Sequence, residues 1–98
     1  MIEIKLFSKV GNFAENKDIA KEIRVGRIVP ALEKDQEVVL DFAGVDAMTQ
    51  SFAHALISEL IRKYGAEVLD MISFKNCTET VKKIITIVVD YMTDDLGR

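Results

Sequence analysis

Several residue types are scarce in this 98-residue sequence, and each scarcity excludes a class of protein. The single cysteine, Cys77, excludes an internal disulfide and suits a reducing compartment. One cysteine and one histidine are too few for a structural zinc set, so no metal is expected. Acidic residues outnumber basic ones by 16 to 13, which leaves no basic excess for binding nucleic acid. No apolar run is long enough to span a membrane.

The remaining composition indicates one small globular domain. The sequence starts MIEIKLFSK, an alternation of apolar and charged residues that is typical of a strand and not of a signal peptide. We therefore expect a cytoplasmic protein with a single domain over residues 1–98, whose polar end frays from about residue 93. Because no Gly-rich run links a strand to a helix, no nucleotide cofactor is expected.

The clearest pattern lies over residues 37–65. An apolar run at 38–40 predicts a central strand that is covered on both faces. Gly44 then marks the turn by which the chain leaves the sheet. Between an N-cap at Thr49 and a C-cap at Gly65, apolar residues spaced by three and four predict a helix that faces the core. Its apolar stripe consists of Phe52, Ala53, Leu56, Ile57, Leu60 and Ile61.

Weaker patterns precede and follow this stretch. Residues 2–6 alternate as a strand toward the sheet edge, and Phe13 with Ala14 adds at most a short extended segment. A helix begins near Asn16, and we expect it to kink or break before Pro30.

A third strand ends near Lys75, and Asn76 is expected to cap the last helix in a capping-box spacing. The buried stripe of that helix is Val81, Ile84, Ile85, Val88 and Met92.

The order β-α-β-α-β-α predicts an α/β domain. Strands that are joined through helices form a mainly parallel sheet of three or four strands, or a mixed sheet if the first strand is antiparallel, with helices packed against it. The last helix has an unusually wide apolar arc, because Ile87, Val89 and Tyr91 extend its stripe. These three residues are either core, or a patch for a partner or for self-association as a homodimer.

Asp41, Ser51 and His54 are the residue types of a nucleophilic triad, and Ser51 and His54 are three apart on one helix. However, the sequence has no Gly-x-Ser-x-Gly elbow and no evident oxyanion hole, so we expect no catalytic residues and no enzyme activity. Cys77 near a helix start is either a reactive thiol or a packed, inert one, and the inert interpretation is favoured.

The residues that remain lie where the predicted helix begins. Exposed amides and the positive end of the helix dipole coincide around Thr49, Gln50 and Ser51, which favours an anion or a phosphorylated hydroxyl. The simpler alternative is that Thr49 and Ser51 are only cap and first-turn residues.

The segment Leu40–Val45, followed by Thr49–Ala53, resembles the STAS-like domain family of unassigned function. It is more distantly similar to STAS domains, which occur in sulfate transporters and anti-sigma factor antagonists. The positions that match the STAS motif in register are Asp41, Gly44, Val45, Met48 and Ser51.

This resemblance implies a STAS-like fold and a regulatory role. In bacterial antagonists, a partner anti-sigma kinase phosphorylates the matching serine and so releases the antagonist. Ser51, or else Thr49, is then the expected phosphoacceptor of a phosphorylation switch. The expected partner is a protein, namely an ATP-binding histidine-kinase-like protein.

We expect that partner to dock on the exposed side of the central helix, at Gln50, His54, Ser58 and Arg62. Two alternatives stay open. One is a passive homo-oligomerisation or scaffold module that uses the apolar last helix. The other is a domain that binds a small anionic ligand or nucleotide at the corner formed by Asp41, Gly44, Val45 and Met48.

Overall fold

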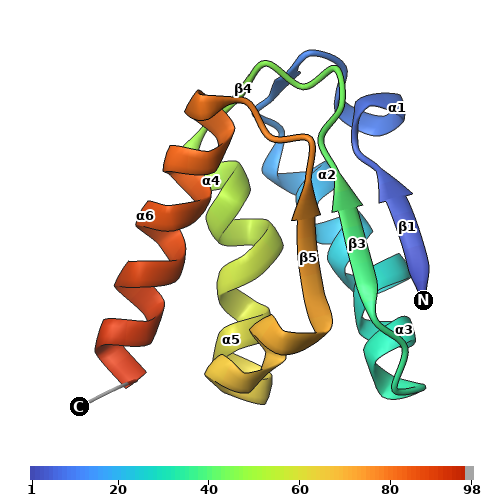
Figure 1. Cartoon of the computed structure of the whole chain (residues 1–98), viewed down its shortest axis with the longest axis vertical. Coiled ribbons are helices and arrows are strands. Elements are labelled where there is room, and N and C mark those ends of the chain that lie inside the picture. Colours follow the sequence, from blue (N-terminus) through green and yellow to red (C-terminus); the bar gives the residue numbers. More distant parts are fainter. Residues whose placement is uncertain (97–98) are drawn as a thin grey trace.

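The computed structural model describes residues 1–96, with side chains described for residues 1–94. The predicted alternation of strands and helices is confirmed, and several short elements are added to it (Figure 1). The elements in chain order are β1 (Ile2–Lys5), α1 (Phe7–Val10), β2 (Phe13–Ala14), α2 (Lys17–Ile23), the π-helical turn η1 (Arg24–Ile28), α3 (Val29–Glu33), β3 (Val38–Asp41), β4 (Ala47–Met48), α4 (Gln50–Ala53), the π-helical turn η2 (His54–Ser58), α5 (Glu59–Tyr64), the 3-10 helix η3 (Ala66–Met71), β5 (Ile72–Lys75) and α6 (Glu79–Leu96).

The main sheet has the strand order β1-β3-β5, and both of its strand pairs are parallel. The direction of the first strand, which the sequence left open, is therefore parallel to that of its neighbour. Ile4, Leu40 and Phe74 lie side by side in the register of the three strands. The short strands β2 and β4 form a separate parallel pair, which the sequence indicated only through its extended segment at Phe13.

Within residues 1–96, helices cover only one face of the main sheet, so the expectation of a central strand covered on both faces is wrong. In Figure 1 the helices lie behind and beside the sheet, and none crosses its front. The uncovered face, called here the open face, carries four exposed side chains and the half-buried Val39. Lys75 Nζ lies 2.8 Å from Glu3 Oε2, so an ion pair spans β3 on this face. The exposed residues of the open face are Glu3, Lys5, Ser73 and Lys75.

The helix that begins at Lys17 was expected to kink or break between Val25 and Pro30, and it does not break. It runs on through the π-helical turn η1 into α3, where proline occupies the first turn. A proline ring clashes with the carbonyl four residues earlier, and the wider turn, which contains Gly26, accommodates it. Arg24 in this turn donates to the carbonyl oxygen of Ala55 at 2.6 Å, which ties the helix to the one that follows β4.

The central helix (residues 50–64) consists of α4, η2 and α5 without interruption. All six residues of its predicted stripe are buried, which confirms the face that the spacing indicated. Together with Leu40 and Val38 from the sheet and Val81 from α6, this stripe forms the middle of one hydrophobic core.

The last helix begins at a different cap from the expected one. Thr78 Oγ1 accepts a hydrogen bond from the amide of Val81 at 3.1 Å, so Thr78 and not Asn76 caps α6. Asn76 has φ +58 and lies before the helix. The predicted frayed tail is helical as far as Leu96, and residues 97 and 98 lie outside the described residues.

Candidate functional site

Asp41 ends β3 and links it to the end of β5. Its Oδ1 accepts from the amide of Ala43 at 2.9 Å and from Asn76 Nδ2 at 3.0 Å. The left-handed backbone of Asn76 is one that asparagine adopts more readily than most residues. The hydrogen bond from Asn76, and after it that from Ala43, holds the pKa of Asp41 below its usual range. Asp41 therefore acts as a structural link in its charged form.

A tight turn follows Asp41. The amide of Val45 donates to the carbonyl of Phe42 at 2.9 Å, and Gly44 between them has φ +88. A positive φ at this position is the requirement of a type II turn, which glycine meets without strain. The ring of Phe7 covers Gly44, because a Cβ on that glycine would lie 2.8 Å from Phe7 Cδ1. The sequence therefore located the turn correctly at Gly44.

The segment between this turn and the central helix, residues 44–51, is called the corner here. Two sets of backbone bonds hold it in place. Asp46 donates to the carbonyl of Asn12 at 2.8 Å, and Thr49 donates to that of Ala14 at 3.0 Å. The β2–β4 pair lies between these bonds, so the start of the central helix is attached to the start of the chain.

Thr49 and Ser51 differ in accessibility. Thr49 is half-buried and is the predicted N-cap, since its Oγ1 accepts from the amide of Phe52 at 3.1 Å. Ser51 is exposed, as is Gln50, and the Ser51 hydroxyl makes no hydrogen bond to any residue whose side chain is described. Of the two candidate acceptors, Ser51 is thus the one that a macromolecule can reach.

Two residues of the anion site that the sequence predicted, Val45 and Met48, do not face solvent. Val45 is 1% exposed and Met48 is 4% exposed, and both belong to the hydrophobic core. The prediction that they line an anion site is therefore wrong in its geometry, because Val45, just after the turn, and Met48, in β4, both pack into the core. Asp41 adds a carboxylate to the same region, which does not favour an anion.

The structure brings together two surfaces that the sequence treated as separate. α6 packs beside α4 and η2, and the ring of His54 meets that of Tyr91 edge to face at 5.9 Å between centroids. Ile87, one turn before Tyr91, is 41% exposed, and Tyr91 is 65% exposed. Val89 is half-buried and packs against the core, because two residues along a helix place it on the opposite flank.

The two remaining residues of the predicted partner interface, Ser58 and Arg62, differ in their exposure. Ser58 is buried, and its hydroxyl donates to the carbonyl of His54 at 2.5 Å. The prediction that Ser58 lies on the exposed side of the helix is wrong, because Ser58 belongs to η2, which packs against both α2 and α6. Arg62 is exposed, as expected, and forms an ion pair with Glu59.

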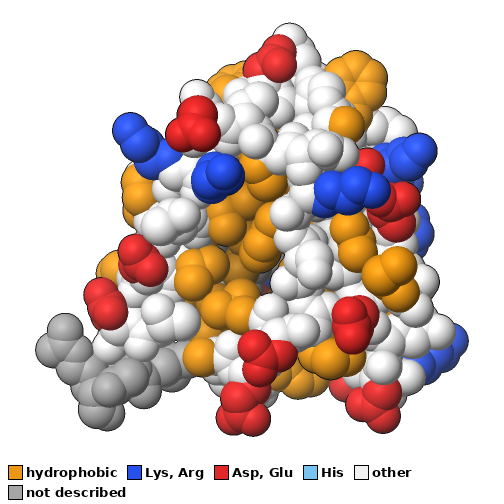
Figure 2. Space-filling model, in the orientation of Figure 1, with side chains coloured by type: hydrophobic (Ala, Val, Ile, Leu, Met, Phe, Trp, Pro, Cys, Tyr) orange, Lys and Arg blue, Asp and Glu red, His pale blue; other side chains and the backbone are white. Residues whose placement is uncertain are grey.

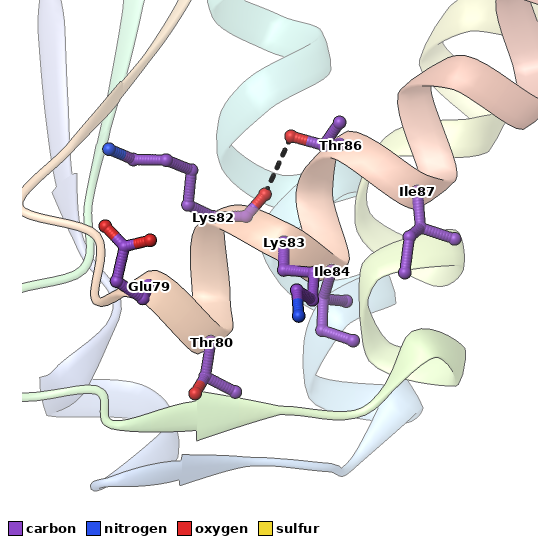
Figure 3. A pocket seen from close by; sticks show the side chains of 7 residues that line it. All are labelled: Glu79, Thr80, Lys82, Lys83, Ile84, Thr86 and Ile87. Carbon is purple, nitrogen blue, oxygen red and sulfur yellow. Dashed lines mark hydrogen bonds between the residues drawn. The ribbon is translucent and has the colours of Figure 1, made fainter.

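A shallow depression lies on α6 itself (Figure 3). Lys83, Ile84 and Ile87 project from one side of the helix, while Thr86 donates to the Lys82 carbonyl on the other. All residues that line the depression belong to this one helix, so it does not enclose a ligand. A second hollow lies between β5 and α6, where Figure 2 shows apolar side chains with basic ones above and acidic ones below.

The described residues do not assemble the chemistry of a hydrolase or a metal site. No hydrogen bond connects Ser51, His54 and Asp41, because His54 lies against Tyr91 and Asp41 is bound to Asn76. Over the described part of the chain, no group of three or more His, Cys, Asp or Glu residues could hold a metal ion. Burial raises the pKa of Cys77, which agrees with the inert interpretation of that thiol.

The architecture defines the class of the protein. A parallel sheet whose central strand leads through a tight turn to an exposed helix start, with helices packed on one face, is consistent with a STAS-like domain.

Comparison with protein families leads to the same result. The family model described as a STAS-like domain of unknown function matches residues 20–82, and the chain belongs to this family. Searches of curated proteins and of solved structures give no match. Within residues 1–96, none of the helices has the length and apolar character needed to cross a membrane.

Three contacts that shape the site are not among those that the sequence predicted. These are the bond between Asp41 and Asn76, the cover of Phe7 over Gly44, and the cap at Thr78. Only the last had a usable signal, since a threonine three residues before the first buried position of a helix is a typical N-cap.

Proposed function

We propose that this domain is a regulatory protein–protein interaction module that acts by binding and not by catalysis. The partner contacts a docking surface that combines the start of the central helix with the adjacent flank of α6. The observation that carries the proposal is the ring contact between His54 and Tyr91, which joins the two surfaces into one. The docking surface consists of Gln50, Ser51, His54, Ile87 and Tyr91.

The composition of this surface supports binding to another protein. Ile87 and Tyr91 expose apolar area at its centre, and aromatic residues are enriched at protein interfaces. Gln50 and Ser51 add polar groups on one side, next to amides at the start of the central helix. An apolar centre with a polar border is the usual anatomy of such an interface.

We further propose that phosphorylation of Ser51 switches the docking surface off. A phosphoryl group adds nearly two negative charges beside the first-turn amides, which the helix dipole tolerates in the free protein. In the complex, the same charge would lie in the contact and would have to be desolvated. A loss of about 1.4 kcal/mol already weakens binding tenfold, so one phosphoryl group is sufficient for a switch. By the resemblance to STAS antagonists, the partner is an ATP-binding histidine-kinase-like protein.

Affinity capture from the native cell tests this function. The bait is the wild-type domain, and the variants are Ser51→Ala, Ser51→Asp and Tyr91→Glu. Ser73→Asp is the matched control, because Ser73 is an exposed serine on the open face of the sheet, away from the docking surface. Mass spectrometry quantifies any kinase-like ATPase that is captured.

We expect wild type, Ser51→Ala and Ser73→Asp to capture the partner equally. Ser51→Asp and Tyr91→Glu are expected to reduce capture by about tenfold or more. Equal capture by all of these variants would refute the docking surface and the switch together. If only Tyr91→Glu reduced capture of the partner, the docking surface would be supported and the phosphorylation switch would be refuted.

A further inference from the structure

β1 is an edge strand with an unpaired side. It has one neighbour in the main sheet, β3, and it is the outermost element on its side of the sheet in Figure 1. In that view α2 and α3 lie behind the sheet and α1 lies beyond the end of β1, so none of the described helices runs along its free side. An edge of this kind presents free amide and carbonyl groups that can pair with another strand.

The hydrogen bonds to β3 establish which residues have their backbone groups on the free side. The amide of Ile2 donates to Glu37 at 2.9 Å, and that of Leu6 donates to Asp41 at 3.0 Å. Backbone groups of successive residues in a strand point to opposite sides, so those of Glu3 and Lys5 face outward. The side chains of the same two residues are exposed on the open face of the sheet.

We propose that two copies of this chain pair through β1, antiparallel, about a two-fold axis that passes between the two Ile4 residues. In this register Glu3 of each copy lies opposite Lys5 of the other. Both residues have outward backbone groups, so each opposed pair is a hydrogen-bonded pair of an antiparallel ladder. The two Ile4 residues form the non-hydrogen-bonded pair between them, and the two sheets become one continuous sheet.

The charges of β1 are complementary in this register. Opposite charges that face each other across two strands stabilise the pair, whereas like charges destabilise it. Charged residues on an edge strand usually prevent pairing, and a strand with lysines alone would repel its own copy. Here Glu3 and Lys5 differ in sign and are two residues apart, so the two-fold axis makes two ion pairs from one strand.

The other edge strand does not have these properties. In β5 the corresponding two-fold would place Ser73 opposite its own copy, and it would leave Lys75 opposite the neutral Met71. Phe74 of β5 also borders the hollow next to α6. Self-association is therefore assigned to β1 and not to β5, nor to the Ile87–Tyr91 flank of α6.

Two charge reversals and their mixture test the pairing. The mass of wild type, Glu3→Lys and Lys5→Glu is measured by sedimentation equilibrium over a range of protein concentrations. Lys21→Glu, on the exposed face of α2, is the control with the same change in charge as Lys5→Glu. Circular dichroism shows whether each variant is folded. A one-to-one mixture of Glu3→Lys and Lys5→Glu is then examined, because every opposed pair in that heterodimer is again of opposite sign.

Wild type and Lys21→Glu are expected to dimerise with rising concentration. Each β1 variant alone should dimerise about tenfold more weakly or worse, and the mixture should associate as well as wild type. In wild type, hydrogen exchange at the amides of Glu3 and Lys5 should slow at high concentration. A monomer at all concentrations overturns the proposal, as does a dimer that is indifferent to the β1 charges or a mixture that fails to associate. None of these outcomes depends on the proposed kinase-like partner or on phosphorylation of Ser51.

Discussion

Gly44 gives the sharpest test of the corner, through the substitution Gly44→Ala. Its φ of +88 lies in the region that residues with a Cβ avoid, at a cost of about 1–2 kcal/mol. The new Cβ would also lie 2.8 Å from Phe7 Cδ1 and 3.1 Å from its Cγ. Because Phe7 is half exposed, its ring can rotate away, and the lost contact adds up to about 1 kcal/mol. The expected total is about 2 kcal/mol.

For a domain of this size, such a loss lowers Tm by roughly 8–16 °C. Urea unfolding followed by circular dichroism measures the free energy of unfolding. In the double variant Gly44→Ala/Phe7→Ala, the clash with the ring is absent and only the backbone strain remains. Comparison with the two single variants therefore separates the free-energy cost of the clash from that of the strain. Gly26→Ala is the matched control, since Gly26 has helical φ and open space around a Cβ, and it should be neutral or stabilising by about 0.5–1 kcal/mol. If the free energy of unfolding of Gly44→Ala were within about 0.5 kcal/mol of the wild-type value, the turn at Gly44 would not require a glycine and this reasoning would be wrong.

Three further predictions follow from the caps and the titrating groups. Thr78→Ala should destabilise the protein by about 1 kcal/mol in urea unfolding, while Thr80→Ala, a matched control inside α6, should cost less. The pKa of Asp41 is lowered in the folded protein, so its contribution to stability is present above about pH 4 and is lost as pH falls through the folded pKa. In Asp41→Asn, the free energy of unfolding should therefore fall less steeply than in wild type as the pH is lowered below about 4. An equally steep fall in both proteins would contradict this. Because burial raises the pKa of Cys77, that thiol should react with a disulfide reagent at pH 8 more slowly than the thiol of the unfolded chain.

The sequence predicted those parts of the fold that depend on local periodicity. The stripe of the central helix is buried at every predicted position, and the turn at Gly44 and the cap at Thr49 are where they were expected. The final helix was also located, although its cap was assigned to Asn76 two residues too early. In each case, side chains within one or two turns determine the outcome, so neighbouring residues carry the information.

The errors in the candidate site have a different origin. Ser58 was expected to be exposed because it lies outside the predicted apolar stripe, but η2 packs against both α2 and α6 and buries it. Val45 and Met48 were expected at a ligand corner, but both side chains pack into the core, and Met48 does so from the β2–β4 pair. Both deviations depend on contacts with segments far away in the sequence, which a local pattern does not contain.

The sequence by itself determined that this chain has an α/β fold with a central strand, a turn and an amphipathic helix in succession. Hydrophobic spacing and turn residues are local signals, and they suffice for that result. Only the tertiary structure decided that β1 runs parallel, that one face of the sheet stays open, and that His54 meets Tyr91. These features follow from how distant elements share one small core, and packing between elements is a property of the whole chain.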